Sequence, residues 1–328
     1  MKILYVLYKA DTKSHQKAIQ KLRDDGHEVM PLIITAMSKD GIGSLKNKIS
    51  QEWGLCIWNI HQNMGAVRKF QRFTNSLYGH LSIEHDILGG APDVSVHAKK
   101  ECGVFSFQKH NTAWLKKHKK CSIIKSQWNK VEIDYDTVEL EGSNIDKDAI
   151  YIGTHNPRVK KYLRMDHEDS YFKLFRKIWY KPYLTPKWLK KGTIQLPKEF
   201  WGTEGTYHCS KIAKIWFTYG SSSYMDALLY GCIPILLPSP KMKIIEKKNS
   251  YLHKVKLFSD WQVKQVKFNA LVCTKGIGKV IKKLQSNDEF FQEVLEKLKD
   301  EWWDDEHINL LPYSEALSEF VKNLEKDG

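Results

Sequence analysis

The sequence has no long apolar run. No segment reaches the roughly 20 consecutive apolar residues that a membrane-spanning helix needs, and the opening "MKILYVLYKADTK" turns polar too early for a secretory signal. We therefore expect a soluble, cytoplasmic protein without a transmembrane segment.

Closely paired cysteines are also lacking. Six cysteines are scattered over 328 residues, and their spacing favours neither a zinc site nor a secreted disulfide framework. The chain also lacks an obvious metal-binding carboxylate motif, an internal repeat and a low-complexity tract. We expect buried free thiols, no bound metal and no cofactor.

Acidic residues are fewer than basic ones, which gives a net charge of +14. Residues 97–130 hold nine lysines and one acid, and residues 241–283 hold twelve lysines and two acids. The last stretch, 287–328, reverses this with thirteen acids and four lysines. Such segregation favours a polyanionic partner, either nucleic acid or an acidic membrane face. A source organism whose proteins are all rich in lysine is the alternative.

Strand and helix patterns alternate along the chain. "KILYVLY" is followed by a helix that stops at Gly26 and by a second strand, and this alternation restarts at "AIYIGTH" after the polar stretch "EGSNIDKD". The later strands include "KIAKIWFTYG", "CIPILLP" and "HKVKLFS". We predict an α/β protein with two Rossmann-like domains that face each other across a cleft, residues 1–145 and 146–311. The last helix, 312–328, docks on either domain and completes the first if it docks there.

The segment "GSSSYMDALLYGCIPILLP", residues 220–238, predicts a loop, a helix and a buried strand after the strand that precedes it. A serine caps the helix and Gly231 ends it with a positive φ. In this βαβ unit the Gly-Ser loop directs backbone N–H groups at the carboxyl edge of a sheet, which suits a phosphate. An ordinary capped strand-to-helix turn is the alternative.

This segment resembles the nucleotide-sugar half of glycosyltransferases with the two-domain GT-B fold. The matching residues are Asp226, Ala227, Gly231, Cys232, Ile233 and Pro234. The resemblance implies that Asp226 accepts hydrogen bonds from the ribose of a nucleotide-sugar donor. It also implies a pyrophosphate site formed by Gly220, Ser221, Ser222 and Ser223. The chain departs from the family pattern in having Asp where Glu is commoner, and in lacking a glycine-rich loop after the first strand.

A second candidate donor site opens the second series, in "IYIGTHNPRVKKYLR". Gly153, Thr154 and His155 end the strand, and Arg158 follows in the next turn. A guanidinium there can hold a diphosphate as its charge grows in the transition state, without a metal. The alternative is a solvated first turn of a helix.

A candidate catalytic base lies in "LSIEHDILGGAPD". Here a strand runs into Glu84, His85 and Asp86 and then into a Gly-Gly loop. A carboxylate or imidazole at a strand end can take the proton of an acceptor hydroxyl. Asp86 is the first choice, because this position looks like that of the base in phage DNA β-glucosyltransferases, and His85 is the second. A polar loop with turn-capping acids is the alternative.

A basic and aromatic segment is a candidate nucleic-acid interface. Its residues are Lys116, Lys117, Lys119, Lys120, Trp128 and Lys130. Lysines contact phosphates and a tryptophan stacks on bases in such interfaces. The alternative is that tryptophans pack the domain while lysines face water.

The order of these motifs resembles that of T-even phage DNA glucosyltransferases. The resemblance implies a monomeric, metal-independent glycosyltransferase that moves a sugar from a UDP-sugar to the hydroxymethyl group of a modified pyrimidine in double-stranded DNA, after flipping the base. One alternative is a glycosyltransferase or glycerophosphotransferase of cell-wall or capsule polymers. Another is a nucleic-acid-binding protein without catalytic activity.

Overall fold

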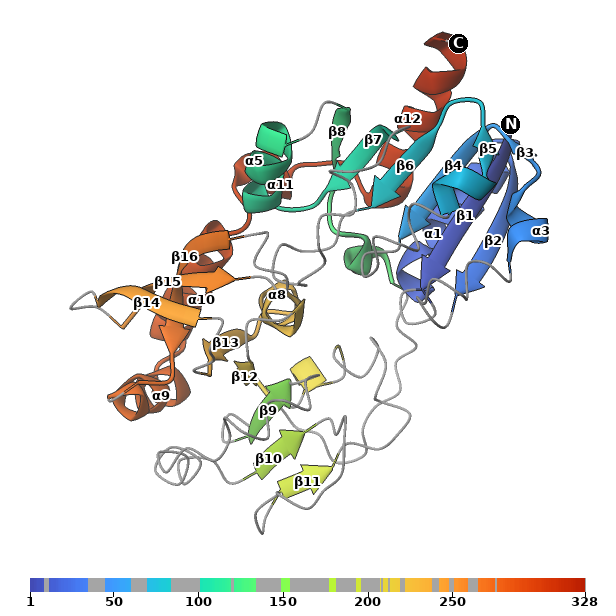
Figure 1. The fold of residues 1–328 in the computed structure, drawn as a ribbon. Coiled ribbons are helices and arrows are strands. Elements are labelled where there is room, and N and C mark those ends of the chain that lie inside the picture. The colour runs from blue at the N-terminus through green and yellow to red at the C-terminus, as the bar shows by residue number, and fades with distance from the viewer. Residues whose placement is uncertain are drawn as a thin grey trace. The chain divides into compact units, whose positions relative to one another are not determined.

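The structure is a computed structural model with two compact units (Figure 1). It describes residues 1–8, 12–34, 45–59, 70–83, 101–118, 121–133, 149–153, 177–180, 193–195, 207, 209–211, 213–218, 222–237, 242–247, 251–258, 265–274 and 276–327. The first unit takes the described residues of Met1–Asp134 and Trp302–Gly328, and the second those of Tyr135–Phe258 and Gln265–Glu301. The chain thus returns to the first unit at Trp302, earlier than the expected boundary at residue 312.

The first unit is built on a parallel sheet, which in the described residues has six strands in the order β2-β1-β4-β6-β7-β8. The central strand β1 has no exposed side chain between Ile3 and Leu7, as expected of a parallel strand covered on both faces. The strands are β1 Lys2–Tyr8, β2 Glu28–Ile34, β4 Leu55–Asn59, β6 His80–Ile83, β7 Glu101–Ser106 and β8 Ser122–Lys125.

Helices and a small ribbon complete the first unit. Helix α1 turns its buried residues Ala18, Ile19 and Leu22 inward, and Gly26 follows it at φ 89°, as the sequence predicts. The elements are η2 Lys13–His15, α1 Gln16–Asp24, α3 Lys46–Ile49, the β3–β5 ribbon (Glu52–Trp53 and Asn75–Ser76), α5 Lys109–His118, η4 Asn129–Glu132, α11 Asp305–Ile308 and α12 Tyr313–Asp327.

The second unit has a larger sheet, with the strand order β11-β10-β9-β12-β13-β16-β15-β14 in the residues that the structure describes. Its parallel strands, numbered along the chain, follow the Rossmann order 3-2-1-4-5-6, and β15 and β14 extend it antiparallel. The bounds are β9 Ala149–Gly153, β10 Lys177–Tyr180, β11 Thr193–Gln195, β12 Ile215–Thr218, α8 Ser222–Leu229, β13 Ile233–Leu236, β14 Met242–Lys247, β15 His253–Phe258, β16 Gln265–Val272, α9 Ile277–Ser286 and α10 Asp288–Asp300.

The predicted α/β class with two Rossmann-like domains is therefore confirmed. The six cysteines are free, and Cys56, Cys209, Cys232 and Cys273 are buried while the other two are partly exposed. Burial raises the pKa of the Cys56 and Cys232 thiols to about 12, so both stay protonated at neutral pH. Among the described helices none has the length and apolar content of a membrane span.

Helix α12 docks on the first unit through buried and charged contacts. The hydroxyl of Tyr313 lies 2.6 Å from that of Tyr5, and both rings are fully buried. Farther along, Asp25 accepts hydrogen bonds from Ser318 at 2.5 Å and from Lys322 at 2.9 Å. These contacts, with the Ser318 bond first, lower the pKa of Asp25 from 3.8 to about 2.

We expect Asp25→Asn to remove a pH-dependent part of the free energy of unfolding. A lowered pKa means that the ionised carboxylate stabilises the folded state above pH 3.8, and that this contribution disappears as the pH falls towards 2. Urea unfolding at several pH values should show the wild type and the variant converging over that range. Asp24→Asn, which removes an exposed neighbouring carboxylate, is the matched control for the loss of one charge. A wild-type advantage over Asp25→Asn that does not change with pH would contradict this.

Candidate donor site at the carboxyl edge of the second sheet

The second sheet reverses its strand order between β9 and β12. Strands β10 and β11 lie on one side of β9, and β12, β13 and β16 lie on the other. Ligands of such sheets bind at the carboxyl ends of the two strands that flank this switch point. Here the two strands end together, because Gly153 pairs with Thr218. The two strands that precede the predicted donor-binding segments thus end side by side.

A pair of hydroxyl groups ties the end of β12 to the start of α8. Thr218 Oγ1 lies 2.5 Å from Ser223 Oγ, and both side chains are buried. The bond fixes where the helix begins relative to the strand. The first N–H groups of a helix have no partner within it and favour negative charge, so this end of α8 suits a phosphate.

The Ser223 side chain differs in one respect from the expectation. The resemblance implies that its hydroxyl holds a pyrophosphate, whereas the structure directs this hydroxyl to Thr218. With 2% exposure, Ser223 positions the helix start. Ser222 is the first residue of α8. Gly220 and Ser221, the other members of the predicted loop, lie outside the described residues.

Asp226 lies one turn into α8 and is only 5% exposed. Its neighbours Tyr224, Met225, Ala227 and Leu228 have no exposed surface, so almost every side of this part of the helix is covered. A buried carboxylate needs polar partners, and Asp226 is not without an interaction partner. The carboxylate is thus part of the packed interior rather than of a peripheral loop, so truncation to Ala would disturb packing as well as any ligand contact.

The end of α8 follows the predicted pattern. Gly231 has φ 72°, a conformation that glycine adopts without strain. The N–H of Cys232 donates to Ala227 O at 2.7 Å and that of Gly231 to Leu228 O at 3.1 Å. These bonds satisfy the last carbonyls of the helix, and the chain passes directly into β13.

The other predicted residues of the donor and catalytic sites lie mostly outside the described part of the chain. Thr154, His155 and Arg158 follow the end of β9 but are outside it. The same holds for Glu84, His85 and Asp86, which follow β6 after Ile83. Their roles remain predictions.

The proposed nucleic-acid segment is only partly on the surface. Lys116 and Lys117 are exposed on α5, whereas Lys119 and Lys120 lie outside the described residues. Trp128 is 3% exposed and its ring lies 6.3 Å from that of Trp303. Lys130 is 8% exposed, with its Nζ 5.1 Å from the Trp128 ring centroid. Since Trp128 packs inside the unit, it does not offer a free ring face for stacking on a base.

A buried histidine at the switch point of the first sheet was not singled out from the sequence. His15 Nδ1 lies 2.9 Å from the Tyr5 hydroxyl, and Nε2 lies 2.8 Å from Asn59 Nδ2 and 3.0 Å from Asn129 Nδ2. Two amide donors on Nε2 leave the proton on Nδ1, which donates to Tyr5. Asn59 ends β4, next to β1, where this sheet reverses its order. The sequence feature that could have identified His15 is the position of an ionisable residue soon after the first strand.

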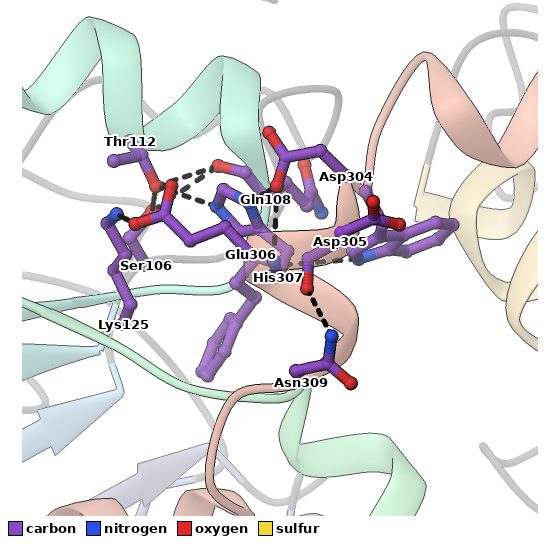
Figure 2. A network of polar contacts seen from close by, with 11 residues as sticks. Ser106, Gln108, Thr112, Lys125, Asp304, Asp305, Glu306, His307 and Asn309 are labelled. Atoms are coloured by element: carbon purple, nitrogen blue, oxygen red, sulfur yellow. Dashed lines mark hydrogen bonds and ion pairs between the residues drawn. The ribbon is translucent and has the colours of Figure 1, made fainter.

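A carboxylate and histidine group on α11 has the composition of a metal site. Among the described residues, Asp304, Glu306 and His307 bring ligand atoms within 4.8 Å of one another. Figure 2 shows that each already has a protein partner. Asp304 Oδ1 accepts from the His307 N–H at 3.1 Å and lies 2.6 Å from Nδ1, and His307 Nε2 lies 3.3 Å from Thr112 Oγ1. Glu306 pairs with Lys125. Helix capping and ion pairing account for the cluster.

Comparison with known proteins supports the fold. No family model and no curated protein sequence matches the chain. MnaA from S. aureus, solved with UDP, is 10% identical with a TM-score of 0.61, over 99% of this chain and 96% of that one. A Listeria monocytogenes protein assigned as a UDP-N-acetylglucosamine 2-epimerase is 9% identical with a TM-score of 0.59, over 98% and 94%. The wall teichoic acid polymerase TagF is 10% identical with a TM-score of 0.52, over 100% and 88%. The chain has the α/β fold of GT-B structures, with two Rossmann-like domains.

We expect Thr218 and Ser223 to be energetically coupled. Thr218→Val or Ser223→Ala alone leaves a buried hydroxyl without this partner, at a cost of about 1–3 kcal/mol. The double variant should cost clearly less than the sum, which a double-mutant cycle in urea would measure. Thr218→Val combined with Ser126→Ala, in the other unit, serves as the additive control. Equal additivity in both cycles would contradict a structural role for the hydroxyl pair.

Proposed function

We propose that this protein is a transferase whose donor is activated by a nucleoside diphosphate, bound where β9 and β12 end. One observation supports this most: Gly153 and Thr218 pair at the switch point of the sheet, and the Thr218–Ser223 bond starts α8 there. A strand end without a side chain lets a phosphate approach the backbone, and a helix start favours its charge.

Other residues of this segment have proposed roles in donor binding. Arg158, after β9, would neutralise the diphosphate as it leaves, so that no metal is needed. Asp226 would accept hydrogen bonds from the ribose. Its burial favours this, since a desolvated carboxylate makes a stronger hydrogen bond than an exposed one.

The donor class is supported by what related folds contain. MnaA was solved with UDP, and a TagF variant was solved after soaking with CDPG. Both ligands carry a pyrimidine nucleotide by name. We therefore favour a UDP-activated or CDP-activated donor.

For the acceptor, we favour a cell-wall or capsule polymer over hydroxymethylated DNA. TagF is named as a wall teichoic acid polymerase, which fits the polymer alternative. In addition, the burial of Trp128 and Lys130 removes two of the side chains on which the DNA interpretation depends. Asp86 keeps its proposed role as general base for either acceptor, with His85 and Glu84 beside it.

Nucleotide binding should stabilise the protein. With UDP or CDP at ~100 times its dissociation constant, the free energy of unfolding should rise by about 2.7 kcal/mol. Asp226→Asn, which keeps the shape of the buried side chain, should lose most of this gain, while Asp25→Asn in the first unit should keep it. Thermal shift against a panel of nucleotides and nucleotide sugars measures both. Absence of any shift in the wild type would overturn the donor site.

Loss of the proposed base should separate chemistry from binding. Asp86→Asn should lower turnover by a factor on the order of 10²–10⁴ and should leave the nucleotide shift intact, because Asp86 follows a strand of the other unit. His85→Gln is the matched comparison. A large loss only in His85→Gln would assign the base to the imidazole, and normal turnover in both would remove this segment from catalysis.

The acceptor can be identified by mass spectrometry of products. The enzyme would be incubated with UDP-sugars or CDP-polyols and either teichoic-type polymer or DNA that contains 5-hydroxymethylcytosine. Transfer to the polymer alone is expected. Transfer to DNA alone would reinstate the DNA interpretation.

A further inference from the structure

Two cysteines lie level with one another on neighbouring strands of the first sheet. Strands β7 and β8 are parallel (green in Figure 1), and Gly103 pairs with Ser122 at the start of their ladder. Cys102 and Cys121 each come one position earlier. Neighbouring strands are about 4.8 Å apart, and the Cα atoms of a disulfide are about 4.4–6.8 Å apart. The spacing of the two backbones therefore falls within the range of a disulfide.

The two side chains point to the same face of the sheet. Gly103 faces α12, because a Cβ added to it would lie 3.0 Å from Cζ of Phe320. Side chains alternate along a strand, so the positions before Gly103 and Ser122 face away from α12. Glu101 shares that face with the cysteines, since Cys121 Sγ donates to Glu101 Oε2 at 3.7 Å.

This pair differs from the other cysteines in its exposure. Cys102 and Cys121 are partly exposed, whereas the other four are buried. Burial is the main cause that raises the pKa of the Cys102 thiol to about 12, and the charges of three neighbours, Glu101, Cys121 and Cys56, raise it further. The thiols of Cys102 and Cys121 are thus close enough to interact. Cys56 lies on β4, two strands from β7, which is about 10 Å and beyond the reach of a disulfide.

Closing the bond requires a small local change. Cys102 Sγ donates to His80 O on β6 at 3.3 Å, so it has to turn about χ1 towards β8. A thiol is a weak hydrogen-bond donor, and the rotation gives up little. The register of β7 with β6 shifts at Cys102, and β8 is the last strand of the sheet in the described residues. Neither strand is therefore held by regular pairing on both sides at this point.

We propose that Cys102 and Cys121 form a reversible disulfide under oxidising conditions. Cys121 reacts first, because burial keeps the Cys102 thiol protonated. Its thiolate attacks the S–S bond of a low-molecular-weight disulfide such as glutathione disulfide and releases one glutathione thiolate. The Cys102 thiolate then attacks the Cys121 sulfur of the mixed disulfide and releases the second. The protein thiols lose two electrons, the oxidant is reduced to two molecules of glutathione, and these take up the two protons.

The bond would join the two ends of the segment that carries α5. Cys102 and Cys121 are 19 positions apart, and α5 lies between them. A disulfide that closes a loop of this length stabilises the folded state by restricting the unfolded chain. In a reducing compartment such a pair stays reduced and responds to oxidative conditions. The proposal is independent of the donor site, which lies in the second unit.

The test is thiol mapping of the folded protein in glutathione buffers of increasing oxidised fraction. Unreacted thiols are blocked with N-ethylmaleimide, and the protein is digested without reductant for mass spectrometry. We expect one cross-linked pair of peptides, joined through Cys102 and Cys121, in oxidised buffer. The cross-link should disappear on return to reduced glutathione. Oxidation should raise the Tm of the wild type on the order of 5 °C.

Three variants make the test specific. Cys102→Ser and Cys121→Ser should show neither the cross-link nor the rise in Tm, because each lacks one sulfur of the pair. Cys273→Ala, which removes a buried cysteine of the second unit, should behave like the wild type. Circular dichroism before oxidation shows that each variant is folded, and the mapping of the wild type decides the question even if a variant does not fold.

Three outcomes would overturn the proposal. In the first, both thiols remain unoxidised at every glutathione ratio. In the second, each cysteine carries its own glutathione, which means that the two sulfurs do not reach each other. In the third, the cross-link joins other cysteines or forms only after unfolding in urea, which means that the folded sheet does not bring this pair together.

Discussion

The pairing of β9 with β12 is the constraint on which the proposed activity depends. These strands are far apart in the sequence, yet their parallel register brings Gly153 level with Thr218. The order of the sheet reverses here, and ligands of such sheets bind at the carboxyl ends of the strands that flank the reversal. Without this pairing, the segments after Gly153 and Thr218 would not lie close enough to bind the proposed donor together.

A second long-range constraint holds the first unit together. From Trp302 onwards the chain is bound to this unit by contacts with residues between Tyr5 and Glu132. The Lys109 N–H donates to Trp302 O at 3.0 Å, Tyr313 meets Tyr5, and Ser314 donates to Glu132 from its N–H at 2.9 Å and from its hydroxyl at 2.5 Å. The acids that follow Trp302 thus belong to the first unit, whereas the acids of α10 and Glu301 belong to the second unit, as the lysines of β14–β16 do.

Local sequence patterns predicted most of the strands and the ends of two helices, because these features depend mainly on neighbouring residues. Continuous apolar runs identified most of the parallel strands, although β10 and β16 were not predicted. The glycines at 26 and 231 marked helix ends because each needs a positive φ. The βαβ unit around α8 was predicted for the same reason. Strand β14 was missed because its charged residues, Lys243, Glu246 and Lys247, interrupt the apolar run that marks a parallel strand. The β3–β5 ribbon is too short to give a pattern.

Burial of polar residues depends on distant partners, which the sequence does not reveal. A tryptophan among lysines looks the same in sequence whether it stacks on bases or packs, and Trp303, from the far end of the chain, decides that Trp128 packs. In the same way, the sequence suggests that Ser223 binds a phosphate, whereas in the structure its hydroxyl is bonded to that of Thr218 at the end of β12.

His15 shows the converse case, in which three separate segments give one residue its character. Its two ring nitrogens are fixed by Tyr5, Asn59 and Asn129, which come from β1, β4 and η4. Two amide N–H donors face Nε2 inside a fully buried cluster, so the ring prefers the tautomer that carries its proton on Nδ1. No periodicity in the sequence encodes that preference. It follows only from the strand order that brings β1 next to β4, the same kind of reversal that places the candidate donor site in the second unit.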